Sequence, residues 1–524
     1  MATTTYKRPG IFVDETLNPI VVNEPPAGEF VAAFVGTHDF GPSKPTLIRS
    51  WAEFVSLYAG FSGGSMLPFA VHQFFSNGGR SCYVVRAVSA DAKTASLVLK
   101  DRQSGTGENS GAKDVLRITA TAAGTFANSL AVSVTDSGTG PGRFNLTIKA
   151  GGDTAGGAVE RYTDVSLDPT DARNAVALVN APNTGSKFIT LTYLGPTTWK
   201  IDNTPAVTVD QTLAGGTNGA AAPDLSAAAQ SLESTNAVLN INLPGVSDTA
   251  VLNPVIDWCE RYGYAFLVVD SPQIAEGTPT EAAVSKLKEL SPLVNGGTTP
   301  APLRASSYAA VYGPWIQTAD PAVAAVGATR LLPPGGALLG QFARFDVDHG
   351  PHRTPAGQDA VLRGVYSAQY RFTDAQLDEL NVAGINVIRF VPNAGFCPMG
   401  GRTVKAGYPD RYIAVRRFLI HVRKLLVEST GYAVFQPNTP DLWASLTAVV
   451  TQRLTEMTQA GQLKGGSPET AFRVVCNETN NSEATVANGE VHLDIGLALM
   501  RPAEFIAIHI GQWEGGSSSS ETLQ

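Results

Sequence analysis

A short hydrophobic segment near the end of the chain places the strongest constraint on its fold. Residues 505–510 read Phe-Ile-Ala-Ile-His-Ile, a pattern that is typical of a β-strand. Two glycines and four serines follow at 515–520, and they predict a loose tail. We therefore expect neither a hairpin turn nor a later strand to pair with this segment. Because an unpaired strand edge promotes aggregation, the strand must find its partner elsewhere.

The first 28 residues also have strand character without a nearby partner. Two β-like runs, at residues 11–13 and 20–22, are separated by Asn18-Pro19 and followed by Pro25-Pro26. Prolines interrupt helices and favour extended backbone, so residues 1–28 are predicted to form an extended arm.

Composition excludes several classes of protein. A chain of 524 residues is expected to hold about three domains. With 43% hydrophobic and 16% charged residues it can build large cores, and it does not have the composition of a disordered protein. The net charge of -8 argues against a general nucleic-acid binder. The N-terminus has no apolar signal region, and no apolar run approaches the roughly 20 residues of a membrane helix, so neither secretion nor membrane insertion is predicted.

The four cysteines are scattered, and no two form a CxxC pair. Each lies in or beside an apolar run, so we predict buried free thiols, which suit a reducing cytoplasm: Cys82, Cys259, Cys397 and Cys476.

The composition and the hydrophobic pattern change along the chain. In residues 29–90 and 220–354, runs of strand length alternate with helical patterns, which is typical of α/β layering. Residues 91–219 are rich in Thr, Ser, Gly and Ala, with frequent turn signals. We predict a multidomain protein of the α+β or α/β class, with an all-β domain at 91–219 inserted into one α/β domain. A C-terminal domain is expected at 355–502, followed by a strand arm and flexible tail at 503–524.

Three helices are predicted in the C-terminal part. Thr373 and Gln376 form a capping box, and Thr439 with Pro440 marks the start of a helix that ends before Gly461. Between them, residues 408–430 form a helix with an expected buried stripe of Tyr412, Val415, Leu419, Val422 and Leu426. Four basic residues lie off that stripe, which predicts either a solvated face or a docking surface for an acidic partner: Arg416, Arg417, Arg423 and Lys424.

Motifs for catalysis are sparse. The chain lacks GxxxxGK[ST] and HExxH, so neither a P-loop nor a zincin is predicted. One dense polar cluster could hold a metal, although Gly350 and Pro351 interrupt it and favour a polar loop: Asp346, Asp348, His349 and His352.

Segments along most of the chain resemble the contractile tail sheath proteins of myophages, R-type bacteriocins and phage-tail-like contractile injection systems. They occur in the order of that family, and residues 91–219 fall where the family varies by insertion: "RPGIFVDE", "VAAFVGTHDFGPSKPTLIRSWAEFVSLYAG", "AVHQFFSNGGRSCYVVRAV", "VVDSP", "SSYAAVYGPWI", "LLPPGGALLGQFARFDVDHGPHRTPAG", "LNVAGINVIRF", "RYIAVRRFLIHVRKLL", "VFQPNTPDLW" and "RPAEFIAIHI".

The resemblance implies a structural protein without catalytic residues, metal or cofactor. It implies a sheath core near an inner tube, extra domains facing outward, and terminal arms that add strands to neighbouring subunits. The implied partners are copies of the chain, the tail tube protein, and baseplate and terminator proteins, with assembly in the bacterial cytoplasm into a phage tail or tail-like injection particle. The expected strand-exchange residues are Ile11, Phe12, Val13, Ile20, Val21, Val22, Phe505, Ile506, Ala507, Ile508, His509 and Ile510.

The basic helix is our candidate for contact with the tube. Two other functions compete with a sheath. One is a metal-dependent enzyme that uses the Asp346–His352 cluster, and the other is a β-rich adhesive or capsid protein whose domain at 91–219 binds glycans.

Overall fold

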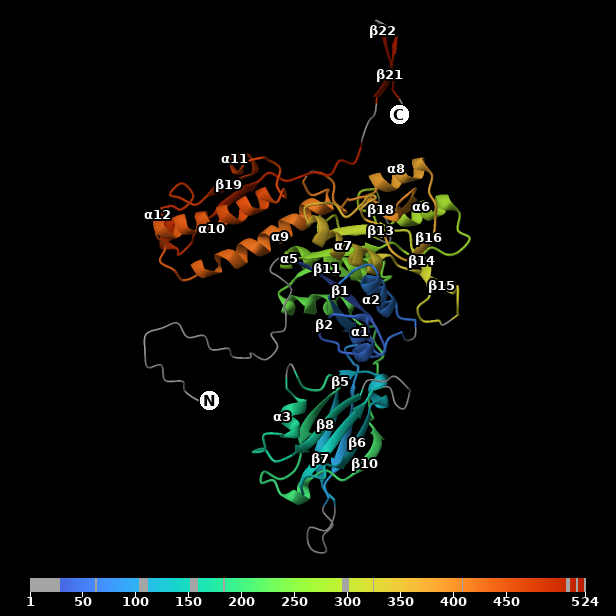
Figure 1. Ribbon diagram of the computed structural model, residues 1–524, viewed down its shortest axis with the longest axis vertical. Helices are drawn as coiled ribbons and strands as arrows, with labels where there is room; N and C mark the ends of the chain where they lie inside the picture. The colour runs from blue at the N-terminus through green and yellow to red at the C-terminus, as the bar shows by residue number, and fades with distance from the viewer. Residues whose placement is uncertain are drawn as a thin grey trace, which may run out of the picture.

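The computed structural model describes residues 29–505, except 62–63, 103–111, 151–158, 182–183, 295–300, 324 and 408. Of residues 509–514 and 517–522 it describes the backbone. Figure 1 shows an elongated molecule. A mixed helix-and-strand body lies between a β-rich part at one end and a two-stranded hairpin at the other.

An eight-stranded sheet forms the centre of the body. Its order is β18-β17-β13-β12-β11-β1-β3-β2, with six parallel inner strands and antiparallel pairing at both edges. The inner strands are near-continuous apolar runs because both of their faces are buried. The strands are β1 (Phe30–Thr37), β2 (Thr46–Ile48), β3 (Cys82–Ala87), β11 (Val238–Asn242), β12 (Ala265–Asp270), β13 (Ala309–Gly313), β17 (Ile385–Val391) and β18 (Gly395–Met399).

Helices cover both faces of this sheet, as the predicted α/β layering requires. One face packs against α4 (Leu225–Gln230), α5 (Thr249–Tyr262), α6 (Thr280–Lys288), α8 (Asp374–Val382) and the short 3-10 helix η3 (Ser231–Thr235). The other face packs against α1 (Trp51–Tyr58), α2 (Leu67–Ser76), α7 (Gly335–His349) and the start of α9 (Ile413–Thr430). The capping box of Thr373 and Gln376 is confirmed at the start of α8.

Helix α7 corrects one prediction, because its last turn contains Asp346, Asp348 and His349, which were expected in a loop. The helix continues to His349 since nothing breaks it before Gly350. It lies close against α2: a Cβ added at Gly336 would come within 2.4 Å of the carbonyl oxygen of Ala70. The glycine is therefore required by helix packing.

The chain leaves the central sheet after β3 and returns at β11, and the strands between them form two antiparallel sheets of their own (Figure 1). Their shared core contains buried Ile118, Val132 and Phe144. One sheet has the order β4-β5-β9 and the other β10-β6-β7-β8. The elements are β4 (Thr94–Lys100), β5 (Asp114–Ala123), η1 (Thr125–Ser129), β6 (Ala131–Asp136), β7 (Arg143–Lys149), β8 (Val159–Ser166), α3 (Ala175–Val179), β9 (Ile189–Tyr193), η2 (Ile201–Asn203) and β10 (Thr208–Thr212).

Elements on both sides of the expected domain boundary at residue 355 belong to the same sheets of the body. Strands β17 and β18 lie beyond it and belong to the eight-stranded sheet. A second small sheet also spans the boundary, with β14 (Ile316–Ala319) between β15 (Thr329–Leu332) and β16 (Val365–Ala368).

A smaller C-terminal unit follows, and α9 connects it to the body. Ile413 and Ile420 of α9 pack into the core beside the central sheet, whereas Phe418 and Val422 pack into a separate core with α10. Because α9 lies between two cores, its buried surface is wider than the predicted stripe, and Tyr412, Leu419 and Leu426 are only partly buried. The other elements are η4 (Gly431–Ala433), α10 (Pro440–Gln459), α11 (Pro468–Ala471), β19 (Phe472–Val475), α12 (Glu483–Ala487) and β20 (Asp494–Leu497).

The four cysteines are free and buried, which confirms their prediction. Burial raises the pKa of the Cys82 thiol well above its usual value. Of the helices that the structure describes, none is long and apolar enough to cross a membrane.

A fully buried carboxylate, Asp270, lies at the end of β12. It accepts hydrogen bonds from the backbone N–H of Gly335 at 2.7 Å, the backbone N–H of Gly245 at 3.0 Å and the side-chain amide of Asn242 at 3.0 Å. Burial nevertheless raises the pKa of Asp270 to about 6. The carboxylate therefore ties the sheet to the first turn of α7 at a cost in solvation.

We expect this burial to make stability fall as the pH rises. Between about pH 4 and pH 6 the folded state holds a proton that the unfolded state has lost, so the free energy of unfolding decreases by roughly 2–3 kcal/mol over that range. An Asp270→Asn variant should not show this decrease. Melting temperatures between pH 4 and pH 7 test the prediction, with Asp348→Asn at an exposed position as control. A constant difference between wild type and Asp270→Asn at every pH would contradict it.

Candidate functional site

The two-stranded sheet of the C-terminal unit has the geometry of a strand acceptor. Strands β19 and β20 pair antiparallel, with Phe472 opposite Leu497 and Val475 opposite Asp494. Within the described part of the chain neither strand pairs with a third strand. Both outer edges therefore present backbone N–H and C=O groups that an incoming strand could bind.

One face of this small sheet is supported by a hydrophobic core. Phe472, Val474, Ile495 and Leu497 pack against the core that α9 and α10 share. At the end of the ladder, the side-chain amide of Asn480 donates to the carbonyl oxygen of Val475 at 2.8 Å and to Asp494 at 3.0 Å. Two strands alone are marginally stable, so this support keeps the edges in place for pairing.

The segment after β20 crosses the body and is anchored by an ion pair. The guanidinium of Arg402 donates to both carboxylate oxygens of Glu504, at 3.1 and 2.7 Å, and to the carbonyl oxygen of Asn381 at 3.0 Å. Both side chains of the pair are largely buried. Such two-point arginine–carboxylate contacts fix orientation as well as position.

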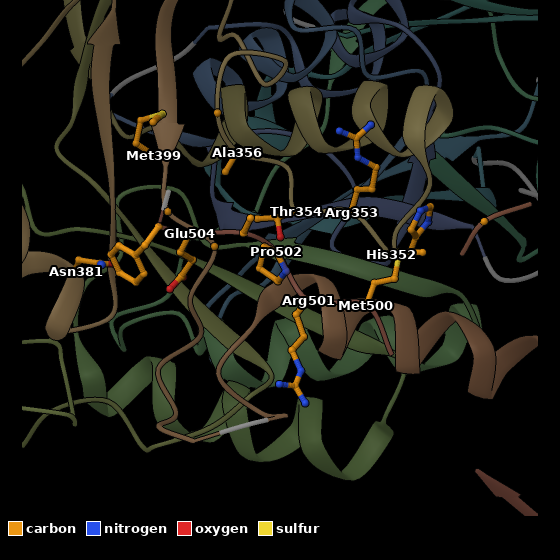
Figure 2. A pocket seen from close by; sticks show the side chains of 16 residues that line it. His352, Arg353, Thr354, Ala356, Asn381, Met399, Met500, Arg501, Pro502 and Glu504 are labelled. Carbon is orange, nitrogen blue, oxygen red and sulfur yellow. The ribbon is translucent and has the colours of Figure 1, made fainter. Parts of the chain in front are cut away.

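A cavity of about 640 Å³ lies where this segment crosses the body (Figure 2). Met500, Arg501, Pro502 and Glu504 line it on one side, and His352, Arg353, Thr354, Ala356 and Met399 contribute from the body. The segment therefore lies against the body up to Glu504.

Beyond this anchor the backbone forms a hairpin that projects away from the body (Figure 1). Strand β21 (His509–Glu514) pairs antiparallel with β22 (Ser517–Thr522), so that His509 lies opposite Thr522 and Glu514 opposite Ser517. The predictions of a loose tail and of no later strand were therefore wrong. Serine side chains do not favour strands, but backbone pairing needs only N–H and C=O groups.

The structure describes few of the predicted strand-exchange residues. His509 and Ile510 lie in β21, and Phe505 lies in an irregular segment with 77% of its surface exposed. The others lie outside the described residues: Ile11, Phe12, Val13, Ile20, Val21, Val22, Ile506, Ala507 and Ile508.

The four basic residues of α9 do not form one exposed surface, which corrects their prediction. The Arg417 side chain is fully buried. Its guanidinium binds the Asp346 carboxylate at two points, one of them at 3.1 Å, and lies over the rings of Phe30 and Phe342. Arg417 therefore stabilises the fold. It was misplaced because an acidic partner 71 residues earlier in the sequence cannot be recognised from helix periodicity.

The other three basic residues differ from one another in exposure. The ammonium group of Lys424 is buried and donates to the carbonyl oxygen of Asn236 at 2.8 Å. Arg416 is partly buried and pairs with Asp410 at 2.5 Å. Arg423 is exposed and lies over the ring of Tyr264. Of the four, Arg423 alone has an exposed side chain.

The acidic and histidine cluster does not converge on a metal site. The Asp346 carboxylate faces Arg417, and the Nδ1 atom of His349 lies 3.0 Å from the Arg353 guanidinium. Burial lowers the pKa of His352. Among the described residues no group of three or more His, Cys, Asp or Glu side chains could hold a metal ion. The geometry gives the metal-enzyme hypothesis no support.

Sequence reasoning did not identify which strands form the acceptor sheet. The apolar patterns in "TAFRVVC" and "GEVHLDIGLALM" are typical of strands, and β19 and β20 lie within these segments. Strand patterns do not reveal how many neighbours a strand has, so the open edges could be recognised only in the structure.

Comparison with known proteins confirms the resemblance found in the sequence. Residues 218–404 match the family model for the central domain of phage tail sheath proteins. The tail sheath protein of Vibrio phage KVP40 is 27% identical over 183 residues, which are 34% of this chain and 26% of that protein. The match thus spans about a quarter of that relative.

Solved structures match nearly the whole chain. The sheath complex of an extracellular contractile injection system (PVC) in the contracted state is 19% identical, with a TM-score of 0.55 over 98% of this chain and 99% of that chain. The contracted helical sheath of the anti-feeding prophage is 20% identical, with a TM-score of 0.53 over 97% and 100%. A sheath tail protein from Listeria innocua is 12% identical, with a TM-score of 0.55 over 86% and 90%. The chain therefore has the fold of sheath proteins.

Proposed function

We propose that this chain, with a sheath-type central domain at residues 218–404, is a structural subunit of a contractile sheath and not an enzyme. One observation supports the proposal most strongly. The β19–β20 sheet has open edges, and the C-terminal strand lies away from the body of its own chain. One surface offers a strand and a different surface accepts one.

In the assembled sheath, β21 of one copy adds to an open edge of the β19–β20 sheet of another copy. Strand β21 keeps one edge without a partner in the described chain, because β22 covers only the other edge. A contact between two different surfaces that does not close on itself generates a helical filament. The N-terminal arm at residues 1–28 makes a second link of the same kind.

The filament works as a motor that stores its energy during assembly. Copies assemble around an inner tube in an extended, kinetically trapped state. A trigger at one end lets the copies rotate and repack as rigid bodies, while the paired strands hold them together. The sheath shortens and drives the tube through a target envelope.

Further contacts follow from this role. The inner tube is the partner of the exposed face of α9, where Arg423 is the remaining candidate contact. Baseplate and terminator proteins bind the two ends, the sheets of residues 91–219 face outward, and assembly takes place in the bacterial cytoplasm. The particle is a phage tail or a tail-like injection system.

Electron microscopy of the purified full-length protein tests the proposal. We expect tubular polymers with a regular helical repeat. If the protein forms only discrete particles or monomers at every protein and salt concentration tested, the proposed function is contradicted.

A further inference from the structure

The loop between α9 and α10 exposes hydrophobic side chains. Phe435 is fully exposed, and Val434 and Tyr432 expose 64% and 46% of their surfaces. Phe435 also has a φ of 67°, in the left-handed region that bulky side chains rarely adopt. We call Tyr432, Val434 and Phe435 the loop knob.

The loop knob is held in a defined conformation. The Tyr432 hydroxyl lies 2.9 Å from the Ser445 hydroxyl, and the indole N–H of Trp443 donates to Asn438 at 2.8 Å. The backbone N–H of Gln436 donates to the carbonyl oxygen of Ala433 at 3.1 Å. Strained backbone and exposed aromatic surface persist together at places where a partner uses them.

An aromatic groove lies elsewhere on the molecule and has a volume of about 480 Å³. Two aromatic pairs line it: Tyr370 with Phe372, whose ring centroids are 6.1 Å apart, and Phe390 with Phe396, at 5.5 Å. Phe390 exposes 51% of its surface. We call this the β16–β18 groove, because it lies beside those strands. An aromatic side chain fits such walls in edge-to-face contact.

Charge makes the two surfaces complementary. Arg371 and Arg389 line the groove, and Asp374 is the single acidic residue among those that line it. Asp441, which follows the loop knob in the sequence, is exposed, whereas Glu428, which precedes it, forms an ion pair with Lys424 at 3.3 Å. The side-chain amide of Asn438 donates to the backbone carbonyl oxygen of Glu490 at 2.9 Å, and the Glu490 carboxylate lies 3.2 Å from the His492 ring.

The two surfaces cannot meet within one molecule. Figure 1 shows the junction of α9 and α10 at one end of the upper body and β16 and β18 toward the other end. A contact between them must therefore join two copies head to tail, which is the arrangement that produces an open helical assembly.

We propose that the loop knob of one copy inserts Phe435 into the β16–β18 groove of another copy, as a side-chain contact in addition to the exchanged strands. This inference rests on the proposed function, because it assigns a second contact within the same polymer. The contact would also explain why the left-handed backbone at Phe435 is retained.

Site-specific photo-crosslinking tests the inference. Phe435 is replaced by benzoylphenylalanine in the full-length chain, polymers are irradiated, and the linked peptides are identified by mass spectrometry. We expect covalent dimers joined between position 435 and residues 366–396. Val326, which is also fully exposed, is the matched control position and should give no link to the groove. Links from position 435 to another region or to a tube protein, or no links in well-formed polymers, would overturn the inference.

Substitutions give an independent test. Phe435→Ala and Phe390→Asp should each lower the yield of polymers at least tenfold, while circular dichroism shows a folded protein. Val326→Ala should keep the wild-type yield. Wild-type yield in both groove and knob variants would refute the inference. If the wild-type chain forms no tubes, the proposed function itself fails, whereas tubes without the crosslink refute this contact alone.

Discussion

Deleting residues 506–524 should leave a folded protein that forms no tubular polymers. The deletion removes β21 and β22 but keeps Glu504, so the ion pair with Arg402 still holds the preceding segment against the body. Its thermal stability should stay close to that of the wild type, because the removed hairpin projects away from the body. Light scattering and electron microscopy measure assembly, and a thermal melt measures folding.

A shorter deletion is the matched control. Removing residues 515–524 eliminates β22 but keeps β21, the strand that we assign to the neighbouring copy. This variant should still form polymers. Polymers formed by the chain without residues 506–524 would remove the C-terminal strand from the mechanism of assembly.

Replacing Arg417 with alanine should destabilise the protein by about 3–5 kcal/mol, because breaking one side of a buried ion pair leaves the other charge without its partner. Asp346 would lose both contacts with the guanidinium, and the rings of Phe30 and Phe342 would lose a cation above them. Urea denaturation followed by circular dichroism gives the difference in the free energy of unfolding.

The matched control is Arg423→Ala on the same helix. Arg423 is exposed and contacts the ring of Tyr264, so its loss should cost about 1 kcal/mol or less. Equal effects of the two substitutions would show that the Arg417 pair does not stabilise the fold in the way that its burial indicates.

Local patterns predicted most of the secondary structure because the relevant interactions lie close together in the sequence. The apolar runs of β1, β3, β12 and β13 are long enough for strands and too short for helices. The start of α10 was located by Thr439, whose side chain accepts from the backbone N–H of Leu442. The resemblance added the fold of the whole chain, which comparison with solved structures confirms.

Contacts between distant residues could not be predicted in the same way. The ion pair of Arg417 and Asp346 and the position of α9 between two cores depend on how separate segments pack. Periodicity located one hydrophobic stripe but not the second core. The domain boundary at 355 was wrong for a similar reason, since β17 joins the central sheet through β13.

The resemblance implied a strand donor and an acceptor in a neighbouring subunit, but the sequence did not locate the acceptor sheet. An unpartnered strand pattern at the end of a chain is visible in the sequence, whereas an open edge is a property of neighbours in space. The serine-rich strand β22 was missed because its pairing uses the backbone and leaves no side-chain signal.

A cryo-electron microscopy reconstruction of the assembled polymer tests the central claim most directly. We predict continuous backbone hydrogen bonds between β21 of one copy and β19 or β20 of another. A reconstruction in which β19 and β20 pair with no other copy, and β21 pairs only with its own β22, would contradict the account.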